Sequence, residues 1–286
     1  MKPFRHCAAL LLLAAAATTP APATGAASYD SCTGCIAAVP VVISTQGTWC
    51  FRKDLATGIG TGAAITVAAN NVTIDCNGFK LGGLAAGAGT QTVGVASTGR
   101  LNTAVRGCRI RGFVSAVALS GDGGGHLVED NILEGNTHTA LQVHGDGSLV
   151  RRNRILDTGG STVFLGEAVG MRGSGAIEVV DNEFRGFAPA TTEESMHAGS
   201  IGLAIASGAG VRVAGNRFRD LQTFGFGLAY AISLSGTTGA EVVDNSIVGV
   251  YGGVFCGSQS DVAWRNYINW TSVPVWICTD GGNTVL

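Results

Sequence analysis

Apolar and polar positions repeat along the chain in one short pattern. Residues 178–186 read EVVDNEFRG, and residues 241–249 read EVVDNSIVG. Six other segments show the same order of an apolar stretch, a polar centre and a resumed apolar stretch: TIDCNGF (73–79), AVRGCRI (104–110), LVEDNIL (127–133), VRRNRIL (150–156), VRVAGNRF (211–218) and VAWRNYI (262–268). Such self-similarity indicates an array built from one supersecondary unit.

The polar centres of these segments align in one column. Its members are Asn77, Cys108, Asn131, Asn153, Asn182, Asn216, Asn245 and Asn266. The closest neighbours in the column define a unit of about 22 residues, with insertions in the longer intervals. Each unit continues through a variable loop into a second apolar segment, such as ALQVHG at 140–145. Glycine and asparagine turns therefore separate three short strands per unit, and no helical periodicity follows the N-terminal segment.

A unit of three short strands cannot enclose a core of its own. Units stacked about 4.8 Å apart share one interior and pair their backbones with those of their neighbours. An asparagine at the same place in every unit can satisfy its buried amide by bonding to the next asparagine, and asparagine also tolerates the left-handed turn conformation. The pattern predicts an all-β solenoid with an Asn ladder.

The asparagine column and the segment AAITVAANNVTIDCNGFKLGG (63–83) resemble the right-handed parallel β-helix family, which is also described as pectin-lyase-like. The resemblance implies a single-stranded right-handed parallel β-helix solenoid of about eight coils over residues 63–286. It also implies that polymers bind in a groove on the strand after the variable loop. The family includes lyases, hydrolases, epimerases, phage tailspikes and non-catalytic surface proteins, so the fold does not select an activity.

Two N-terminal segments differ from the repeats. Lys2, Arg5 and His6 precede an apolar run and then small residues, which predicts a signal peptide over 1–27 with cleavage between Ala23 and Ala27. We therefore expect a secreted or periplasmic protein. That apolar run is too short to span a bilayer, and no run of about 18 apolar residues follows it, so no membrane span is expected. Residues 28–62 show few ladder features and are expected to form an N-terminal cap that closes the solenoid.

Cysteines fit export to an oxidising compartment. Of the 8 cysteines, all but Cys7 lie after the predicted signal peptide. Cys32, Cys35 and Cys50 are expected to staple the cap with disulfide bonds. Cys256 and Cys278 are one unit apart, which places them on stacked strands and favours a disulfide between them. The odd number in the mature chain leaves at least one thiol outside these pairs, and its partner is not specified.

Charge limits the classes of partner. Charged residues make up 13% of the 286 residues and the formal net charge is -2, whereas soluble domains usually contain about 25% charged residues. Nucleic-acid and anionic-membrane partners usually require a basic excess, so neither is expected. A polysaccharide or a cell-surface glycan is the expected partner. The sequence carries no signal for the oligomeric state.

One candidate site lies on the strand after the variable loop. Strict alternation places these residues on the outer surface: Gln142, His144, Gly170 and Arg172. His144 can act as a base near neutral pH, and Arg172 can hold a carboxylate and neutralise developing charge. Elimination on a polyuronate needs both functions, and Glu167 is placed to orient the histidine. The alternative interpretation is that His144 and Arg172 are solvated surface residues.

The longest insertions contain a second group of candidates. Glu193, Glu194 and His197 lie in the loop at 186–200, where two carboxylates would serve as acid and base or bind calcium. The alternative is that these three residues are solvated side chains of a surface loop without a role in binding or catalysis. Phe224, Phe226 and Tyr230 would stack against sugar rings or pack the loop on the solenoid. We predict no metal site and no cofactor, calcium being the one ion that these carboxylates would suit.

These observations leave two functions open. The first is an extracellular surface module that binds glycans of unspecified identity, favoured by low charge and by a mostly small outward column. The second is a polysaccharide-active enzyme, a lyase that eliminates on an acidic polysaccharide with His144 as base and Arg172 as neutraliser. Established catalytic sets of β-helix enzymes do not transfer residue by residue to this chain, so whether it is an enzyme is left open.

Overall fold

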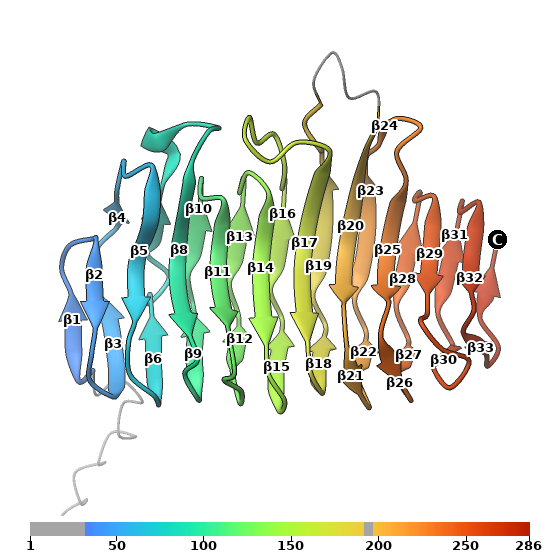
Figure 1. Ribbon diagram of the computed structural model, residues 1–286, viewed down its shortest axis with the longest axis horizontal. Coiled ribbons are helices and arrows are strands. Elements are labelled where there is room, and N and C mark those ends of the chain that lie inside the picture. Colours follow the sequence, from blue (N-terminus) through green and yellow to red (C-terminus); the bar gives the residue numbers. More distant parts are fainter. Residues whose placement is uncertain (1–31, 192–196) are drawn as a thin grey trace, which may run out of the picture. The chain divides into compact units, whose positions relative to one another are not determined.

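A computed structural model describes residues 32–191 and 197–286, and residues 32–286 form one compact unit. Within it, parallel strands from successive coils form three long sheets (Figure 1). The signal peptide expected at 1–27 lies outside the described residues, as do residues 28–31 of the expected cap. Among the described residues, no helix is long and apolar enough to cross a bilayer.

Each coil passes through the three sheets in the same order, which we name B, A and C. Sheet A contains β1 (Gly34–Ile36), β3 (Gly47–Phe51), β6 (Val72–Asp75), β9 (Thr103–Arg106), β12 (Leu127–Glu129), β15 (Ser148–Arg151), β18 (Ile177–Val180), β22 (Arg212–Ala214), β27 (Glu241–Val243), β30 (Val262–Trp264) and β33 (Thr279–Asp280). Sheet B contains β2 (Val41–Ile43), β5 (Thr61–Val67), β8 (Gln91–Thr98), β11 (Ser115–Ser120), β14 (Thr139–His144), β17 (Glu167–Ser174), β20 (His197–Ile205), β25 (Ala229–Leu234), β29 (Gly252–Phe255) and β32 (Val273–Trp276).

Sheet C completes each coil, and a few short elements lie outside the three sheets. Sheet C contains β4 (Leu55–Ala56), β7 (Lys80–Gly82), β10 (Arg109–Arg111), β13 (Ile132–Glu134), β16 (Arg154–Leu156), β19 (Glu183–Phe187), β23 (Arg217–Leu221), β28 (Ser246–Val248), β31 (Tyr267–Asn269) and β34 (Thr284–Val285). The additional elements are β21 (Gly208–Ala209) paired with β26 (Thr237–Thr238), β24 (Phe224–Gly225) antiparallel to β20, and the 3-10 helix η1 (Leu84–Ala86).

The described residues form more coils than the asparagine column predicts. Sheet C has ten strands, one per coil, against about eight expected. The difference arises at the ends, because the segment expected to be a cap supplies β1 to β4. These strands pair in the same three sheets as the coils that follow. The expected boundary at residue 63 therefore falls inside β5, one of the long strands of sheet B.

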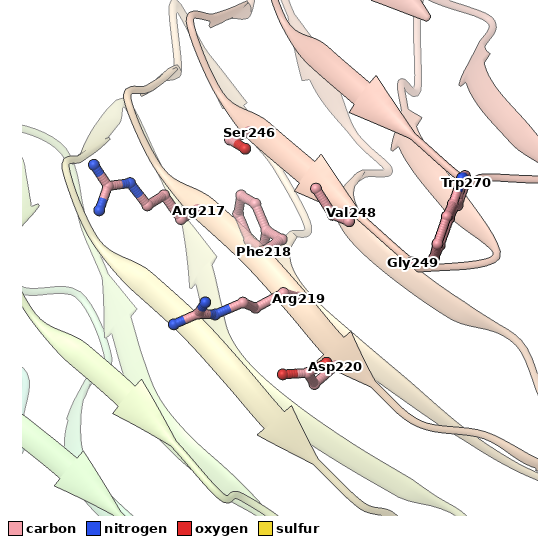
Figure 2. A pocket seen from close by; sticks show the side chains of 8 residues that line it. All are labelled: Arg217, Phe218, Arg219, Asp220, Ser246, Val248, Gly249 and Trp270. Atoms are coloured by element: carbon pink, nitrogen blue, oxygen red, sulfur yellow. The ribbon is translucent and has the colours of Figure 1, made fainter. Parts of the chain in front are cut away.

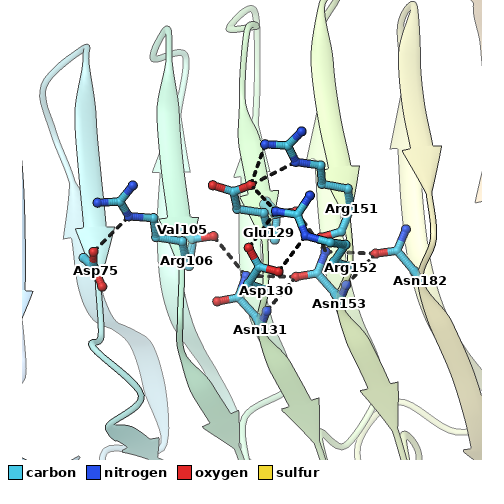
Figure 3. Close-up of polar contacts among 11 residues, drawn as sticks. Asp75, Val105, Arg106, Glu129, Asp130, Asn131, Arg151, Arg152, Asn153 and Asn182 are labelled. Atoms are coloured by element: carbon cyan, nitrogen blue, oxygen red, sulfur yellow. Dashed lines mark hydrogen bonds and ion pairs between the residues drawn. The ribbon is translucent and has the colours of Figure 1, made fainter. Parts of the chain in front are cut away.

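Seven asparagines form a continuous hydrogen-bonded column at the turn from sheet A to sheet C, of which Figure 3 shows Asn131, Asn153 and Asn182. The amide of each donates to the side-chain oxygen of the next at 2.8–3.0 Å, in the order Asn131, Asn153, Asn182, Asn216, Asn245, Asn266 and Asn283. Each amide also donates to a backbone carbonyl, and the oxygen accepts a backbone N–H from the preceding coil, as between Asn153 and Asn182. Every buried polar group of the turn is thereby satisfied.

Two details of the expected column are wrong. Asn77 lies outside it, exposed and bonded to the carbonyl of Phe51 at 3.0 Å, because the turn after β6 has four residues instead of two. Cys76 and Cys108 occupy the buried positions and form a disulfide, while the N–H of Cys108 donates to Asn131. The left-handed conformation also belongs to the residue before each ladder asparagine. These residues are Asp130, Arg152, Asp181, Gly215, Asp244, Arg265 and Gly282, and Gly107 adopts it before Cys108.

Arginine and carboxylate side chains pair across coils beside the ladder (Figure 3). Glu129 contacts Arg151 at 2.8 Å and Arg152 at 2.9 Å, and Arg152 also contacts Asp130 at 2.7 Å. The hydrogen bond from Arg152 lowers the pKa of Asp130 below its usual range. The exposed pair of Arg152 and Asp130 contributes about 0–1 kcal/mol.

Two further disulfides lie near the ends of the solenoid. Cys256 and Cys278 are bonded, on turns that follow the stacked strands β29 and β32. Cys32 and Cys50 are bonded at the other end. Cys35, expected to staple the same segment, is exposed and outside any disulfide, and the Nε of Arg52 donates to its sulfur at 2.8 Å.

Buried phenylalanines fill the interior beside sheet B. Phe184 and Phe218 stack with ring centroids 4.7 Å apart. The strands of sheet B from β5 to β29 each turn two consecutive residues inward, and the first is glycine or alanine: Ala64, Gly94, Ala116, Ala140, Gly170, Gly202, Ala231 and Gly253. A Cβ on Gly202 would lie 2.5 Å from the Phe218 ring and 2.6 Å from the carbonyl of Ala231. The phenylalanine rings therefore fit only because this column of glycine and alanine residues, which we call the small column, leaves room for them.

Removing one ladder amide should destabilise the protein strongly. We expect Asn182→Ala to lower the free energy of unfolding by about 2–4 kcal/mol, because two buried donors of Asn153 lose their acceptor. Asn77→Gly should cost about 1 kcal/mol or less, since Asn77 is exposed and left-handed. Urea unfolding followed by circular dichroism measures both. Equal costs for the two substitutions would contradict the ladder's role.

Adding a methyl group at the small column should also be costly. We expect Gly202→Ala to lower the free energy of unfolding by about 1–3 kcal/mol through overpacking against Phe218. Gly60→Ala is the matched control, because a Cβ there meets nothing within 4 Å. The same urea titration compares the two variants. A Gly202→Ala protein as stable as the control would show that the ring and strand move apart without penalty.

Candidate functional site

Register fixes which side chains meet on the outer face of sheet B. Arg172 lies opposite Gln142, and Ser174 lies opposite His144. His144 and Arg172 are therefore on neighbouring strands, as expected, but two positions apart along them. Both line one hollow of about 410 Å³, together with Gln142 and Ser233. The structure thus brings the predicted base and neutraliser into one groove without a direct contact between them.

Strict alternation fails at one predicted position. The alternation predicts Gly170 on the outer surface beside Arg172, yet this glycine is buried and faces the ring of Phe187. The reason is that Gly170 and Met171 both point inward, so the strand carries one more inward residue than a period of two allows. Arg172 still points outward, because the irregularity lies before it.

Arg172 and Glu167 form an ion pair along strand β17. The guanidinium reaches back five residues to the carboxylate, so Glu167 holds Arg172 and not His144. An arginine has five N–H donors, and one carboxylate does not occupy all of them. Arg172 therefore keeps donors that face the groove, at a side-chain exposure of 40%. This arrangement suits the binding of a second carboxylate from solution.

His144 is held by a hydroxyl instead of a carboxylate. Its Nδ1 and the Oγ of Ser174 are 2.7 Å apart. Burial lowers the pKa of His144, so the imidazole is neutral at pH 7. A neutral imidazole can accept a proton from a ligand in the groove. Asp146 lies in the adjoining turn, where its carboxylate accepts the N–H of Ala176 at 2.7 Å.

The second group of predicted residues is only partly described. Glu193 and Glu194 lie outside the described residues. His197 begins β20, and its Nδ1 accepts the N–H of Phe226 at 3.1 Å. Phe224 and Phe226 are 54% and 81% exposed, which does not fit aromatic rings that pack a loop onto the solenoid. In the part of the chain that the structure describes, no group of three or more His, Cys, Asp or Glu residues is arranged to hold a metal ion.

Sequence reasoning selected Tyr230 as a stacking residue but missed the aromatic strip that it forms at the end of the groove. Tyr230 lies 6.3 Å from Tyr251 and 6.4 Å from Phe255, and Phe255 lies 6.3 Å from Trp276, between ring centroids. Trp276 is 53% exposed and Tyr251 is 40% exposed. The one-unit spacing of Phe255 and Trp276 was a signal in the sequence, since register places them opposite each other.

The groove and the strip are continuous. One register row runs from Gln142 through Arg172, Ala204 and Ser233 to Phe255 and Trp276. Six adjacent strands contribute one residue each, so the row is about 24 Å long. It offers polar groups at one end and aromatic faces at the other, with small side chains between them. The loops from sheet C to sheet B project from one edge of this sheet (Figure 1).

Comparisons with known proteins concern the fold. A family model described as "Right handed beta helix region" matches residues 91–272. Two mutant structures of the periplasmic alginate epimerase AlgG are similar, with TM-scores of 0.52 and 0.50 and identities of 11% and 10%. Both alignments cover 86% of this chain and 76% of that chain. DFA-IIIase from Arthrobacter chlorophenolicus A6 has a TM-score of 0.48 and 13% identity, covering 83% of this chain and 63% of that chain. No curated protein matches the chain.

Burial of His144 predicts a pH dependence of stability. Its pKa is lower in the folded protein than in the unfolded chain, so unfolding takes up a proton between the two values, and stability rises with pH there. The free energy of unfolding should fall as the pH drops below about 6.5. His144→Gln should flatten part of the slope, while His126 and His138, whose pKa values burial also lowers, supply the rest. Urea titrations from about pH 5 to 8 measure it. An unchanged slope in the variant would contradict this assignment.

Proposed function

Because this chain belongs to the right-handed β-helix family, we propose that it is an exported protein that binds an acidic polysaccharide across the outer face of sheet B. The observation that carries the proposal is the continuous row from Arg172 to Trp276. Aromatic rings present apolar faces on which sugar rings stack. A guanidinium with donors to spare recognises a carboxylate through paired hydrogen bonds.

Several features support binding over catalysis. The side chains between Arg172 and Phe255 are small, which leaves room for a chain of sugars to lie along the sheet. His144 pairs with the hydroxyl of Ser174, and no carboxylate among the described residues orients its ring. A general base is usually oriented by such a third group. The groove therefore contains the parts of a binding surface more completely than those of a catalytic site.

Export is part of the same proposal. Three disulfides lie in the described residues, which fits an oxidising compartment. The charged and apolar N-terminal segment agrees with this location. An exported β-helix with a long exposed face meets extracellular or periplasmic polysaccharide directly.

A lyase activity is the second candidate, and it rests on one observation. His144 is neutral because burial lowers its pKa, and it shares a hollow with Arg172. A neutral imidazole can remove the C5 proton beside a uronate carboxylate while the guanidinium neutralises the developing charge. The C4–O glycosidic bond then breaks as the C4–C5 double bond forms, and the leaving oxygen takes up a proton from the imidazolium or from water. Elimination yields an unsaturated product that absorbs in the ultraviolet. Absorbance growth with polyuronates that His144→Ala abolishes would establish this second function.

Affinity measurements test the binding proposal. We expect Tyr251→Ala and Trp276→Ala each to weaken binding of oligogalacturonate or oligoalginate about tenfold, because each removes an exposed stacking surface. Val42→Ala is the control, since Val42 is 61% exposed at the other end of the same sheet. Isothermal titration calorimetry gives the affinities. If the wild-type protein binds neither oligomer, or if both variants bind as tightly as the control, the proposal fails.

A further inference from the structure

A second hollow lies on the outer face of sheet C, away from the proposed groove. It has a volume of about 500 Å³, and its lining includes Arg217, Arg219, Ser246, Val248 and Trp270. Figure 2 shows the two arginines of β23 on one side and the indole of Trp270 on the other, with Ser246 and Val248 between them. The hollow therefore combines two guanidinium groups, a hydroxyl group and an aromatic face.

Trp270 occupies a backbone position that the other coils fill differently. A left-handed residue lies near the end of seven strands of sheet C, within the strand at Gly186 and Asp220 and just after it at Gly112, Gly135, Asp157, Gly249 and Trp270. Six of them are glycine or aspartate, which adopt this conformation most easily. Trp270 adopts it with φ of 55° and is 80% exposed, so burial gives no reason for a bulky ring there. An unfavourable residue held at an exposed turn indicates a functional constraint.

The strands beside the hollow carry an excess of positive charge. The outward side chains of β16, β19 and β23 include Arg154, Arg185, Arg217 and Arg219, against two acidic residues, Glu183 and Asp220. Glu183 pairs with Arg154 at 2.9 Å and with Arg219 at 2.6 Å. Arg185 and Arg217 have no ion-pair partner among the described residues.

Glu183 stays ionised between its two arginines. Burial alone would raise its pKa, but the hydrogen bonds from Arg154 and Arg219 outweigh burial and lower the pKa below the usual range. The net positive charge of this face therefore rests on Arg185 and Arg217, which remain available to a ligand. Asp220 at the rim can accept a hydrogen bond from a sugar hydroxyl.

We propose that this hollow is a second glycan-binding site, which takes a chain of uronates with one ring on Trp270 and the carboxylate of a further residue on Arg217. The distance from β16 to β31 is four strand spacings, or about 19 Å. A chain of several uronates lying across the coils would reach the outlying Arg185 and Arg154 with further carboxylates. The site goes beyond the proposed function, because it uses a different sheet and none of the same residues.

The chemistry favours a uronate over a phosphate polymer. Proteins bind nucleic acids and anionic membranes through dense basic patches, whereas on this face the arginines alternate with Glu183 and Asp220. Single-stranded DNA and anionic lipid vesicles are therefore the competing partners to include in the test.

Calorimetry with tetragalacturonate tests the site, using the full mature chain. Trp270→Gly is the informative variant, because glycine suits the left-handed turn and the protein should remain folded by circular dichroism. We expect the wild type to bind two oligomers per chain, and Trp270→Gly and Arg217→Ala to bind one. The affinity of the lost site should fall at least about tenfold. Lys53→Ala removes an exposed positive charge elsewhere and should leave both sites intact.

The outcomes separate this site from the groove on sheet B. Trp276→Ala should weaken the groove and leave the sheet C site unchanged, and about 1 M salt should weaken the sheet C site by screening. If the wild type binds only one oligomer per chain and Trp270→Gly binds it equally well, the proposal of a second site is wrong, whereas the proposal for the groove on sheet B is unaffected. Loss of binding only in Trp276→Ala overturns the second site in the same way. Binding of DNA or anionic vesicles at Arg217 without binding of the uronate also overturns the proposal.

Discussion

The hydrogen bond from one asparagine amide to the asparagine of the next coil is the interaction on which the other features depend. It repeats from Asn131 to Asn283 with the same partners. Each buried amide needs the coil on either side, so no coil can slip by a residue without leaving donors and acceptors unpaired. The register of all three sheets follows from this constraint. The disulfide between Cys76 and Cys108 takes over the same position where the asparagines end.

Fixed register turns the outer faces into arrays of aligned side chains. On sheet B, it joins Arg172 to the aromatic strip that ends at Trp276, although these residues lie far apart in the sequence. On sheet C, it sets Arg217 beside Ser246 and within one hollow with Trp270. A polymer that lies across the coils therefore meets repeated contacts at the strand spacing. Such an array suits the proposed binding of an anionic glycan, because both the protein and the ligand repeat.

The sequence predicts the stacking better than it predicts the surface. Repeats around asparagine report buried amides, which every coil needs, so the fold follows from them. The position of Asn77 is not predicted correctly because a longer turn keeps the residue pattern while moving the side chain outward. The outward position of Gly170 is also predicted incorrectly, because two consecutive inward residues break the period of two. The one-unit spacing of Phe255 and Trp276 marks part of the aromatic strip, but Tyr251 and the hollow at Trp270 leave no local pattern, because their partners come from different coils joined by loops of different lengths.

Hydrogen exchange of the asparagine side-chain amides is the most direct measurement of the central claim. Nitrogen-resolved NMR distinguishes the Nδ2 protons of the ladder from those of exposed asparagines. The account predicts that the ladder protons, including those of Asn182 and Asn216, exchange only when the whole solenoid unfolds, while those of Asn77 exchange rapidly. Ladder protons that exchange as fast as those of Asn77 would contradict it.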